Sequence, residues 1–223
     1  MKTVVITGAN RGIGLALSKQ YHQNGDHVIA LCRKASDELE ALGVQVIEAI
    51  DVSVLESLIP ISEKLGDQKV DVLINNAGIL RQESIENLSN QAFEQIQDQL
   101  IVNSMGPLKV VSCLLPHLKS GSKVALITSR MGSIEDNTSG SRYGYRMSKA
   151  ALNAAGKSLA IDLAPQSISV GIIHPGYVQT EMTGGSGYIT AEESATQIRE
   201  RIGSLTLERS GQFFHANGEL LPW

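Results

Sequence analysis

The sequence predicts a single α/β domain over residues 1–223, with helices on both faces of a doubly wound sheet of about seven parallel strands. Three observations predict this class. Short apolar segments rich in β-branched residues recur along the chain. Most of them are continuous rather than alternating, which is typical of strands buried on both faces. Segments with helical spacing of apolar residues fill the intervals, so the connections are expected to be right-handed crossovers.

The expected elements follow in chain order. The strand segments are residues 3–7, 27–32, 44–48, 70–75, 123–129, 167–174 and 212–215. The helical segments are residues 13–24, 53–65, 89–118, 141–164 and 191–202. Ser53, with Glu56 three residues later, forms a capping-box pattern at the start of the second helix. Pro107 and Pro116 are expected to kink or shorten the long third helix. The fourth helix is expected to stop at Pro165.

Composition excludes several function classes. The net charge is −4 and aromatic residues make up only 4% of the chain, so neither a basic field nor a base-stacking surface for nucleic acid is expected. Cys32 and Cys113 belong to no paired motif, which favours buried thiols in a reducing compartment. The apolar N-terminal segment is too short for a secretory signal, and no run of about 18 apolar residues is present. We therefore expect a cytoplasmic protein without a membrane partner.

A glycine-rich turn follows the first predicted strand. The segment TGANRGIG occupies residues 7–14 and leads directly into a helix. Glycines at such a turn let the backbone approach a pyrophosphate, and the helix N-terminus supplies N–H groups and partial positive charge. The spacing is G-x-x-x-G-x-G, and the alternative is an ordinary tight strand-to-helix connection. Its place after the first strand of a parallel sheet favours a Rossmann-type dinucleotide site.

The end of the second strand bears on the choice between NAD and NADP. A carboxylate there would bind the ribose hydroxyls, but the strand ends in Cys32-Arg33-Lys34. Arg33 and Arg11 could hold a 2′-phosphate, although both could instead be solvated surface residues. NADP(H) is therefore expected in preference to NAD(H). Asp51, after the third strand, could accept a hydrogen bond from adenine or simply start a helix.

Tyr145 and Lys149 lie four residues apart in a predicted helix, so both side chains leave the same face. A free phenol titrates near pH ~10, and a neighbouring ammonium lowers that value toward the range useful for proton transfer. A surface helix pair is the alternative. Ser129 ends a buried strand, where it could donate a hydrogen bond to a substrate carbonyl. Ser133 is the nearby competitor, and Thr128 is expected to point into the core.

Taken together, these motifs resemble the short-chain dehydrogenase/reductase family. The resemblance spans essentially the whole chain, and the matching features occur in the family's order. They are TGANRGIG at 7–14, NNAG at 75–78, Asn103, Ser129, YRMSK at 145–149 and HPGYVQT at 174–180. The segments ITSRMGSI, YGYRMSKAALN and GELLPW resemble the C-factor-like branch, which also includes small carbonyl reductases.

The resemblance implies a role for each matching catalytic position. Ser129 would orient and polarise the substrate oxygen, and Tyr145 would transfer the proton. Lys149 would lower the pKa of the tyrosine and bind the nicotinamide ribose. Asn103 would hold a water that links Lys149 to solvent. Every position of the pattern carries the expected residue type, which argues against an inactive enzyme.

The resemblance also implies the cofactor contacts. Asp51 and Val52 would hold adenine, and Val178 and Thr180 would contact the carboxamide. NADP(H) is expected, with NAD(H) as the alternative. The other residues expected beside the cofactor are Gly8, Asn10, Arg11, Gly12, Ile13, Gly14, Arg33, Asn76, Ala77, Gly78, Tyr145, Lys149, Pro175 and Gly176.

The segment that would cover the substrate, residues 181–203, is short and begins with a glycine-rich stretch. This indicates an open or small pocket for a small carbonyl or alcohol, which Met182 and Tyr188 could line or merely support by packing. By resemblance, a homodimer or homotetramer is expected. The alternative function is a C-factor-like cell–cell signalling protein that binds a nicotinamide cofactor. A nucleotide-sensing regulator is disfavoured because the catalytic set is intact.

Overall fold

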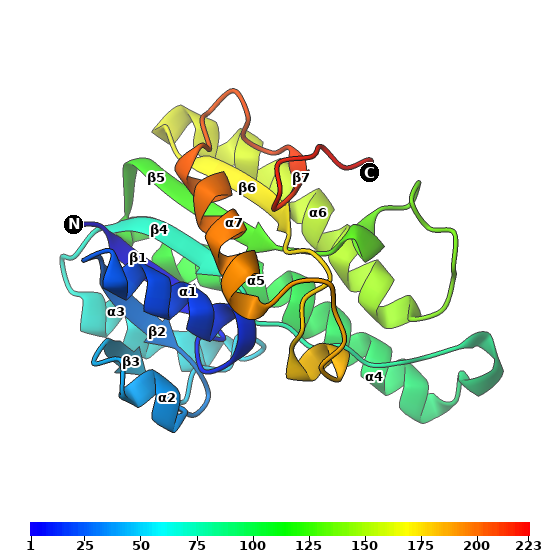
Figure 1. Ribbon diagram of the computed structural model, residues 1–223. Coiled ribbons are helices and arrows are strands. Elements are labelled where there is room, and N and C mark those ends of the chain that lie inside the picture. Colours follow the sequence, from blue (N-terminus) through cyan, green and yellow to red (C-terminus); the bar gives the residue numbers. More distant parts are fainter.

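The computed structural model describes residues 1–223 and contains seven strands in the order β3-β2-β1-β4-β5-β6-β7 (Figure 1). All neighbouring strands pair in parallel. The fold class expected from the sequence is therefore confirmed. The strands are β1 (Thr3–Thr7), β2 (His27–Leu31), β3 (Gln45–Ile47), β4 (Val70–Asn75), β5 (Leu118–Ile127), β6 (Ser169–His174) and β7 (Phe213–His215).

Helices lie on both sides of the sheet, as Figure 1 shows. One side carries α1 (Gly12–Gln23), α2 (Asp37–Glu40) and α7 (Ala191–Gly203). The other carries α3 (Ile59–Leu65), α4 (Asn90–Leu100), α5 (Gly106–Leu114) and α6 (Tyr143–Leu163). Short 3-10 turns occur at Leu55–Leu58, Ile85–Asn87, Leu115–His117, Arg130–Gly132, Ala164–Gln166 and Glu181–Thr183. No helix combines the length with the hydropathy that a membrane-spanning segment requires.

The strand order positions the functional site. The chain moves outward from β1 to β3 and then returns to β4 on the other side of β1. The connections after β1 and β4 therefore diverge to opposite sides of the sheet and leave a crevice at the strand ends, which is where open α/β sheets bind ligands.

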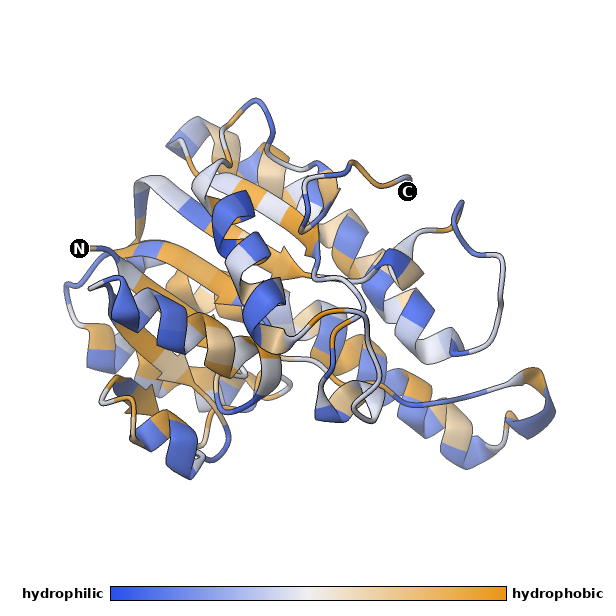
Figure 2. Ribbon diagram, in the orientation of Figure 1, coloured by the Kyte–Doolittle hydropathy of each residue, from blue (hydrophilic) through white to orange (hydrophobic).

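The core is divided by the sheet. Val5 and Leu73 belong to an apolar cluster on the α5–α6 side, whereas Val4, Ile6 and Ile74 belong to one on the α1–α7 side. Neighbouring residues of one strand thus enter different clusters. Because both faces are buried, the strands read as continuous apolar segments, and they are mostly orange in Figure 2.

The second helical segment differs from the expected one. Ser53 does not cap a helix, because its N–H and Oγ both donate to Asp51 Oδ1, at 2.9 and 2.6 Å. A 3-10 turn follows at Leu55–Leu58, and α3 begins only at Ile59, with Pro60 in its first turn. The predicted capping box is therefore wrong. Proline is favoured in the first turn of a helix, and Pro60 places the start of α3 several residues after Ser53.

The long third helix is interrupted, as expected from Pro107. A π-helical turn at Ile101–Met105 separates α4 from α5, and Pro107 lies in the first turn of α5. Proline has no N–H to donate to the carbonyl four residues earlier, which is that of Asn103. The proline therefore explains a local π-turn at the residue that the sequence assigns to the site.

Two further differences from the expected elements concern a short helix and the start of a strand. The sequence did not predict α2, which Ser36 caps by accepting a hydrogen bond from Leu39 N–H at 3.3 Å. Strand β5 begins at Leu118, five residues before the expected start at residue 123, and ends at Ile127. Ser129 therefore follows the strand, in extended conformation.

Candidate active site

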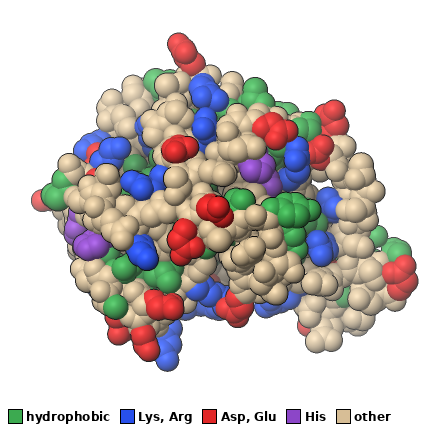
Figure 3. All heavy atoms as spheres, viewed as in Figure 1, with side chains coloured by type: hydrophobic (Ala, Val, Ile, Leu, Met, Phe, Trp, Pro, Cys, Tyr) green, Lys and Arg blue, Asp and Glu red, His purple; other side chains and the backbone are tan.

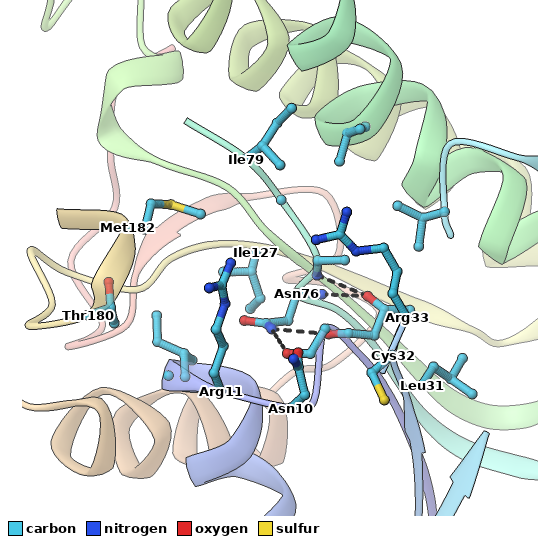
Figure 4. Close-up of a pocket in the computed structure, with 18 of the residues that line it drawn as sticks. Asn10, Arg11, Leu31, Cys32, Arg33, Asn76, Ile79, Ile127, Thr180 and Met182 are labelled. Carbon is cyan, nitrogen blue, oxygen red and sulfur yellow. Dashed lines mark hydrogen bonds between the residues drawn. The ribbon is translucent and has the colours of Figure 1, made fainter. Parts of the chain in front are cut away.

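A cavity of about 570 Å³ lies at the carboxyl ends of the central strands (Figure 4). Thr7, Leu31 and Ile127 are the last residues of β1, β2 and β5, and Asn76 directly follows β4; all four line the wall. Its volume falls within the range of about 300–1,000 Å³ that is usual for small-molecule and cofactor sites. The cavity occupies the crevice expected from the strand order.

The glycine turn forms one wall and leaves no room for side chains at its closest point. A Cβ on Gly14 would lie 2.2 Å from the carbonyl oxygen of Gly8. Gly8 and Gly12 have φ angles of +65° and +52°, which favour glycine. Arg11, the N-cap of α1, makes no side-chain capping bond to the first helical turn. The exposed backbone and the uncapped helix start fit a pyrophosphate.

The segment after β4 holds the glycine turn in place. Asn76 Nδ2 donates to the carbonyl oxygens of Thr7 and Gly8, both at 3.1 Å (Figure 4). The N–H groups of Asn76 and Ala77 both donate to Thr7 Oγ1 at 3.0 Å. The NNAG motif thus fixes the shape of the turn as well as lining the cavity.

Charged groups surround the end of the cavity near β2. Arg33 is exposed and lines the cavity, and Figure 4 shows its side chain together with that of Arg11. Arg11 forms an ion pair with Glu181 across the cavity mouth. Hydrogen bonds from Ser53 lower the pKa of Asp51, and the positive charge of Arg33 lowers it further. Asp51 therefore lines the cavity, but it does not start a helix as the alternative expected, because the 3-10 turn begins only at Leu55 and α3 at Ile59.

Tyr145 lies in the first turn of α6, beside the end of β5. Its side chain is half-buried and lines the cavity. Burial raises the pKa of its phenol, while a hydrogen bond with the Ser129 hydroxyl and the charge of Arg142 oppose that rise. Ser129 Oγ also accepts a hydrogen bond from Met131 N–H at 3.1 Å. Helix α6 and the end of β5 therefore bring the predicted proton donor and the predicted hydroxyl together.

Lys149 is buried one helical turn beyond Tyr145. Its Nζ donates to the carbonyl oxygen of Ile127 at 2.9 Å and lies 5.7 Å from the centre of the Tyr145 ring. Burial lowers the pKa of Lys149 to about 8. The sequence predicted that this lysine would lower the pKa of Tyr145, but burial dominates and the pKa is raised. The difference arises because desolvation disfavours both charged forms.

Asn103 is completely buried behind the cavity. Its Nδ2 donates to the Ile79 carbonyl oxygen at 2.8 Å and to Ser148 Oγ at 3.0 Å, and its Oδ1 accepts from Ile79 N–H at 2.8 Å. The side chain thus joins the π-turn, the segment after β4 and α6. The water that the family resemblance implies at Asn103 stays a prediction.

Most of the predicted cofactor residues lie along the cavity wall. Those that line it are Gly8, Asn10, Arg11, Gly12, Ile13, Arg33, Asp51, Val52, Asn76, Ala77, Gly78, Tyr145, Lys149, Pro175 and Thr180. Those outside the lining are Gly14, Asn103, Ser129, Gly176 and Val178. The Thr128 hydroxyl lies in the core, as expected, and donates to Asn153 Oδ1 at 2.6 Å, but the residue also lines the cavity.

The sequence did not predict several of the residues that line the cavity. They are Thr7, Leu31, Cys32, Ile50, Ser53, Ile79, Arg81, Asp98, Val102, Ile127, Thr128 and Glu181. Two of them carry a usable signal, since Leu31 ends a strand and Ile79 follows NNAG directly. Of the two candidate substrate residues, Met182 lines the cavity, whereas Tyr188 is 88% exposed and packs edge-on against Tyr177.

Comparisons with known proteins identify the family of the chain. The family model for short chain dehydrogenase matches residues 2–187. The chain is 38% identical over 229 residues to 1-hydroxy-2-glutathionyl-2-methyl-3-butene dehydrogenase of Rhodococcus sp. (strain AD45), covering 100% of both proteins. It is 42% identical over 156 residues to C-signal of Myxococcus xanthus, covering 69% of this chain and 93% of that protein.

Solved structures are similar over the whole chain. The carbonyl reductase Sniffer of D. melanogaster has a TM-score of 0.90 at 32% identity, with 100% of both chains covered. The NADPH-bound carbonyl reductase from chicken fatty liver has a TM-score of 0.90 at 27% identity, with 100% of this chain and 99% of that chain covered.

Proposed function

The chain belongs to the short-chain dehydrogenase/reductase family, and from this premise we propose that it is an NADP(H)-dependent carbonyl reductase in which Tyr145 transfers the proton. One observation carries the proposal. Tyr145 and Lys149, one helical turn apart on α6, line the same cavity as Gly8 and Gly12 of the glycine turn. A proton donor and a site fitted to a pyrophosphate therefore share one crevice.

The bound cofactor would supply the hydride, which adds to the carbonyl carbon. Ser129 and Tyr145 would donate hydrogen bonds to the carbonyl oxygen, where negative charge develops. Tyr145 then gives its proton to that oxygen, so the products are an alcohol and a tyrosinate. The raised pKa of Tyr145 keeps the phenol protonated at neutral pH, as a donor must be. Lys149, with a pKa of about 8, is mostly charged at neutral pH and would stabilise the tyrosinate.

The residues present fit the cofactor. The glycine turn would hold the pyrophosphate, Asp51 and Val52 the adenine, and Lys149 the nicotinamide ribose. Arg33 supports NADP(H) over NAD(H), because it stands at the end of β2 where a carboxylate would otherwise bind the ribose. The NADPH in the chicken carbonyl reductase supports the same choice. We further propose a small carbonyl or alcohol as substrate and a homodimer or homotetramer as the assembly.

The test is an assay that follows the absorbance of NADPH and of NADH against aldehydes, ketones, quinones and keto-steroids. A glutathione-conjugated alcohol is added to the panel for the oxidative direction, because the Rhodococcus relative is named for one. Turnover with NADPH is expected. Binding of the cofactor without turnover of any of these compounds would contradict the proposal.

Tyr145→Phe removes the proton donor and leaves the ring. Loss of general acid catalysis should lower kcat by about 10²–10⁴-fold while the affinity for NADPH stays unchanged. Tyr143→Phe, in the same helical turn, is the matched control and should keep full activity. Equal activity of the Tyr145 variant and the wild type would contradict the role of this residue.

A second candidate function rests on the similarity to C-signal. In that case the protein would act in cell–cell signalling, and its chemistry would matter little. The same Tyr145→Phe variant separates the two functions. A signalling activity that survives the substitution favours the second, and one lost together with turnover favours the reductase.

A further inference from the structure

Glu83, in the segment between β4 and α4, is a buried carboxylate beside the proposed active site. Its residue is only 3% exposed, and none of the salt bridges in the structure includes it. Acidic side chains are almost never fully buried unless they are paired. We propose that Glu83 is a positioning residue that caps α6 from outside the helix and so holds Tyr145 in place. The inference rests on the proposed function of Tyr145.

The contacts of Glu83 converge on the start of α6. Its Oε2 accepts a hydrogen bond from Gly144 N–H at 3.3 Å. Its backbone carbonyl accepts one from Arg142 N–H at 2.7 Å. Its other carboxylate oxygen, Oε1, accepts one from Gln99 Nε2 at 2.5 Å. Gly144 immediately precedes Tyr145, so this one residue binds the backbone on which the phenol is mounted.

Helix α6 has no cap of its own. Arg142, at the N-cap, is left-handed with φ 53° and ψ 47°, and its side chain makes no capping bond. The N–H groups of a first helical turn need acceptors from elsewhere. A carboxylate also interacts favourably with the positive end of the helix dipole. Glu83 supplies both the acceptor and the charge.

Close packing makes the position of Glu83 matter. A Cβ on Gly144 would lie 2.4 Å from Gln99 Nε2 and 2.9 Å from Ile96 Cα, so α4 and α6 are in direct contact. Gln99 is fully buried, and its Oε1 accepts from Arg81 N–H at 2.8 Å. The carboxylate, the amide and the two helices form one connected unit, which fixes the first turn of α6 against α4.

Solvent lies on the other side of this unit. A second cavity, of about 410 Å³, is lined by residues of the segments 82–87 and 139–142, none of them hydrophobic and Glu83 among them. In Figure 1 the segment before α4 and the segment before α6 approach each other at the lower right, and Figure 3 shows both acidic and basic side chains on this side of the molecule. Glu83 thus stands between water and the N–H of Gly144. Without the carboxylate, water would compete for the hydrogen bond from Gly144 N–H in the first turn of α6.

Glu83→Gln tests the inference with almost no change in shape. In either orientation, the new amide places an NH₂ group against Gln99 Nε2 or against Gly144 N–H. A displaced phenol should lower kcat by about tenfold to a hundredfold, because misplacement of a reacting group slows the chemical step. The KM for NADPH should stay unchanged. Glu86→Gln, an exposed glutamate of the same segment, is the matched control.

A compensating substitution separates positioning from general damage. In the double variant Glu83→Gln with Gln99→Glu, the new amide at position 83 donates to the new carboxylate at position 99. The amide oxygen at position 83 can then accept from Gly144 N–H. The double variant should recover most of the lost kcat. Ile202→Val, in the core on the other face of the sheet, should lower the Tm without lowering kcat.

Amide hydrogen exchange provides a readout that does not depend on turnover. In Glu83→Gln, exchange at Gly144 and Tyr145 should become at least several-fold faster, while exchange in β4 stays unchanged. Unchanged exchange there, or unchanged kcat in an active enzyme, overturns the inference. If no carbonyl is reduced by the wild type, the proposed function fails, and hydrogen exchange alone decides the role of Glu83.

Discussion

Tyr145 is a half-buried phenol whose proton affinity is set by opposing influences of its surroundings. Burial raises its pKa, and Ser129 and Arg142 lower it. Because reduction requires the protonated phenol, activity should fall as the pH rises through this pKa. The alkaline limb of the pH profile of reductase activity therefore reports on the groups around the Tyr145 hydroxyl.

Arg142→Gln should move that limb to higher pH. Removing a positive charge disfavours the phenolate, so the pKa of Tyr145 rises further. The measurement is kcat/KM for NADPH-dependent reduction against pH. Arg142→Lys keeps the charge and should keep the limb in place. A limb that moves to lower pH contradicts the assignment.

Arg33→Asp should reverse the preference for the cofactor. A carboxylate at the end of β2 repels a 2′-phosphate and accepts hydrogen bonds from ribose hydroxyls. We expect the KM for NADPH to rise about tenfold or more and that for NADH to fall, since each lost or gained contact to a charged group is worth about 1.5–3 kcal/mol.

Lys34→Asp is the matched control for this experiment. It makes the same charge change at the next residue, which does not line the cavity. It should leave the ratio of the two KM values nearly unchanged. A wild-type enzyme that prefers NADH would contradict the role given to Arg33.

At the scale of elements, the site depends on how closely α6 approaches its neighbours. The 3-10 turn Arg130–Gly132 follows Ser129 and packs directly on α6. A Cβ on Gly132 would lie 2.7 Å from the Lys149 carbonyl carbon and 2.9 Å from its oxygen. Since both atoms are backbone, neither element can give way by turning a side chain. The glycine therefore sets the separation between Ser129 and the helix that carries Tyr145.

Gly132→Ala should push the turn away from α6. Overpacking of this kind destabilises proteins by about 1–3 kcal/mol. The displaced Ser129 should lower kcat about a hundredfold, with less effect on cofactor binding. Gly203→Ala, which meets nothing within 4 Å, should change neither kcat nor the Tm appreciably. Full activity of Gly132→Ala would show that the two elements can adjust.

At the scale of the whole molecule, the half-buried His174 couples stability to pH. Burial lowers the pKa of His174 to about 3, and the charges of His215, Arg130 and Lys149 add to this effect. In the unfolded chain the pKa is near 6.5. Between these values the unfolded state binds more protons than the folded state, so stability is complete above about pH 6.5 and is lost as the pH falls toward 3.

His174→Asn should flatten this dependence. One group with such a shift contributes at most about 1.4 kcal/mol per pH unit to the slope of unfolding free energy. Urea unfolding of the wild type and the variant between pH 4.5 and 7 measures the difference. His22→Asn, on the exposed end of α1, should keep the slope of the wild type. If the unfolding free energies of the wild type and His174→Asn change in parallel with pH, His174 is not the source of the pH dependence.

The sequence by itself determined the features that depend on local patterns. Continuous apolar segments predicted the strands, because a strand buried on both faces has no polar side. The spacing of Tyr145 and Lys149 predicted a shared helix face, and TGANRGIG predicted the glycine turn, because both patterns lie within a few residues. Pro107 predicted the interruption that the π-turn now explains.

Only the tertiary structure decided the features that depend on burial and on distant partners. The pKa of Tyr145 is raised because packing removes water from the phenol, which no spacing records. Arg11 meets Glu181 across 170 residues, and Glu83 reaches the start of α6 across 61. Local patterns encode hydrogen bonds and periodicity within an element. Which elements meet, and how much solvent stays between them, is fixed only when the whole chain packs.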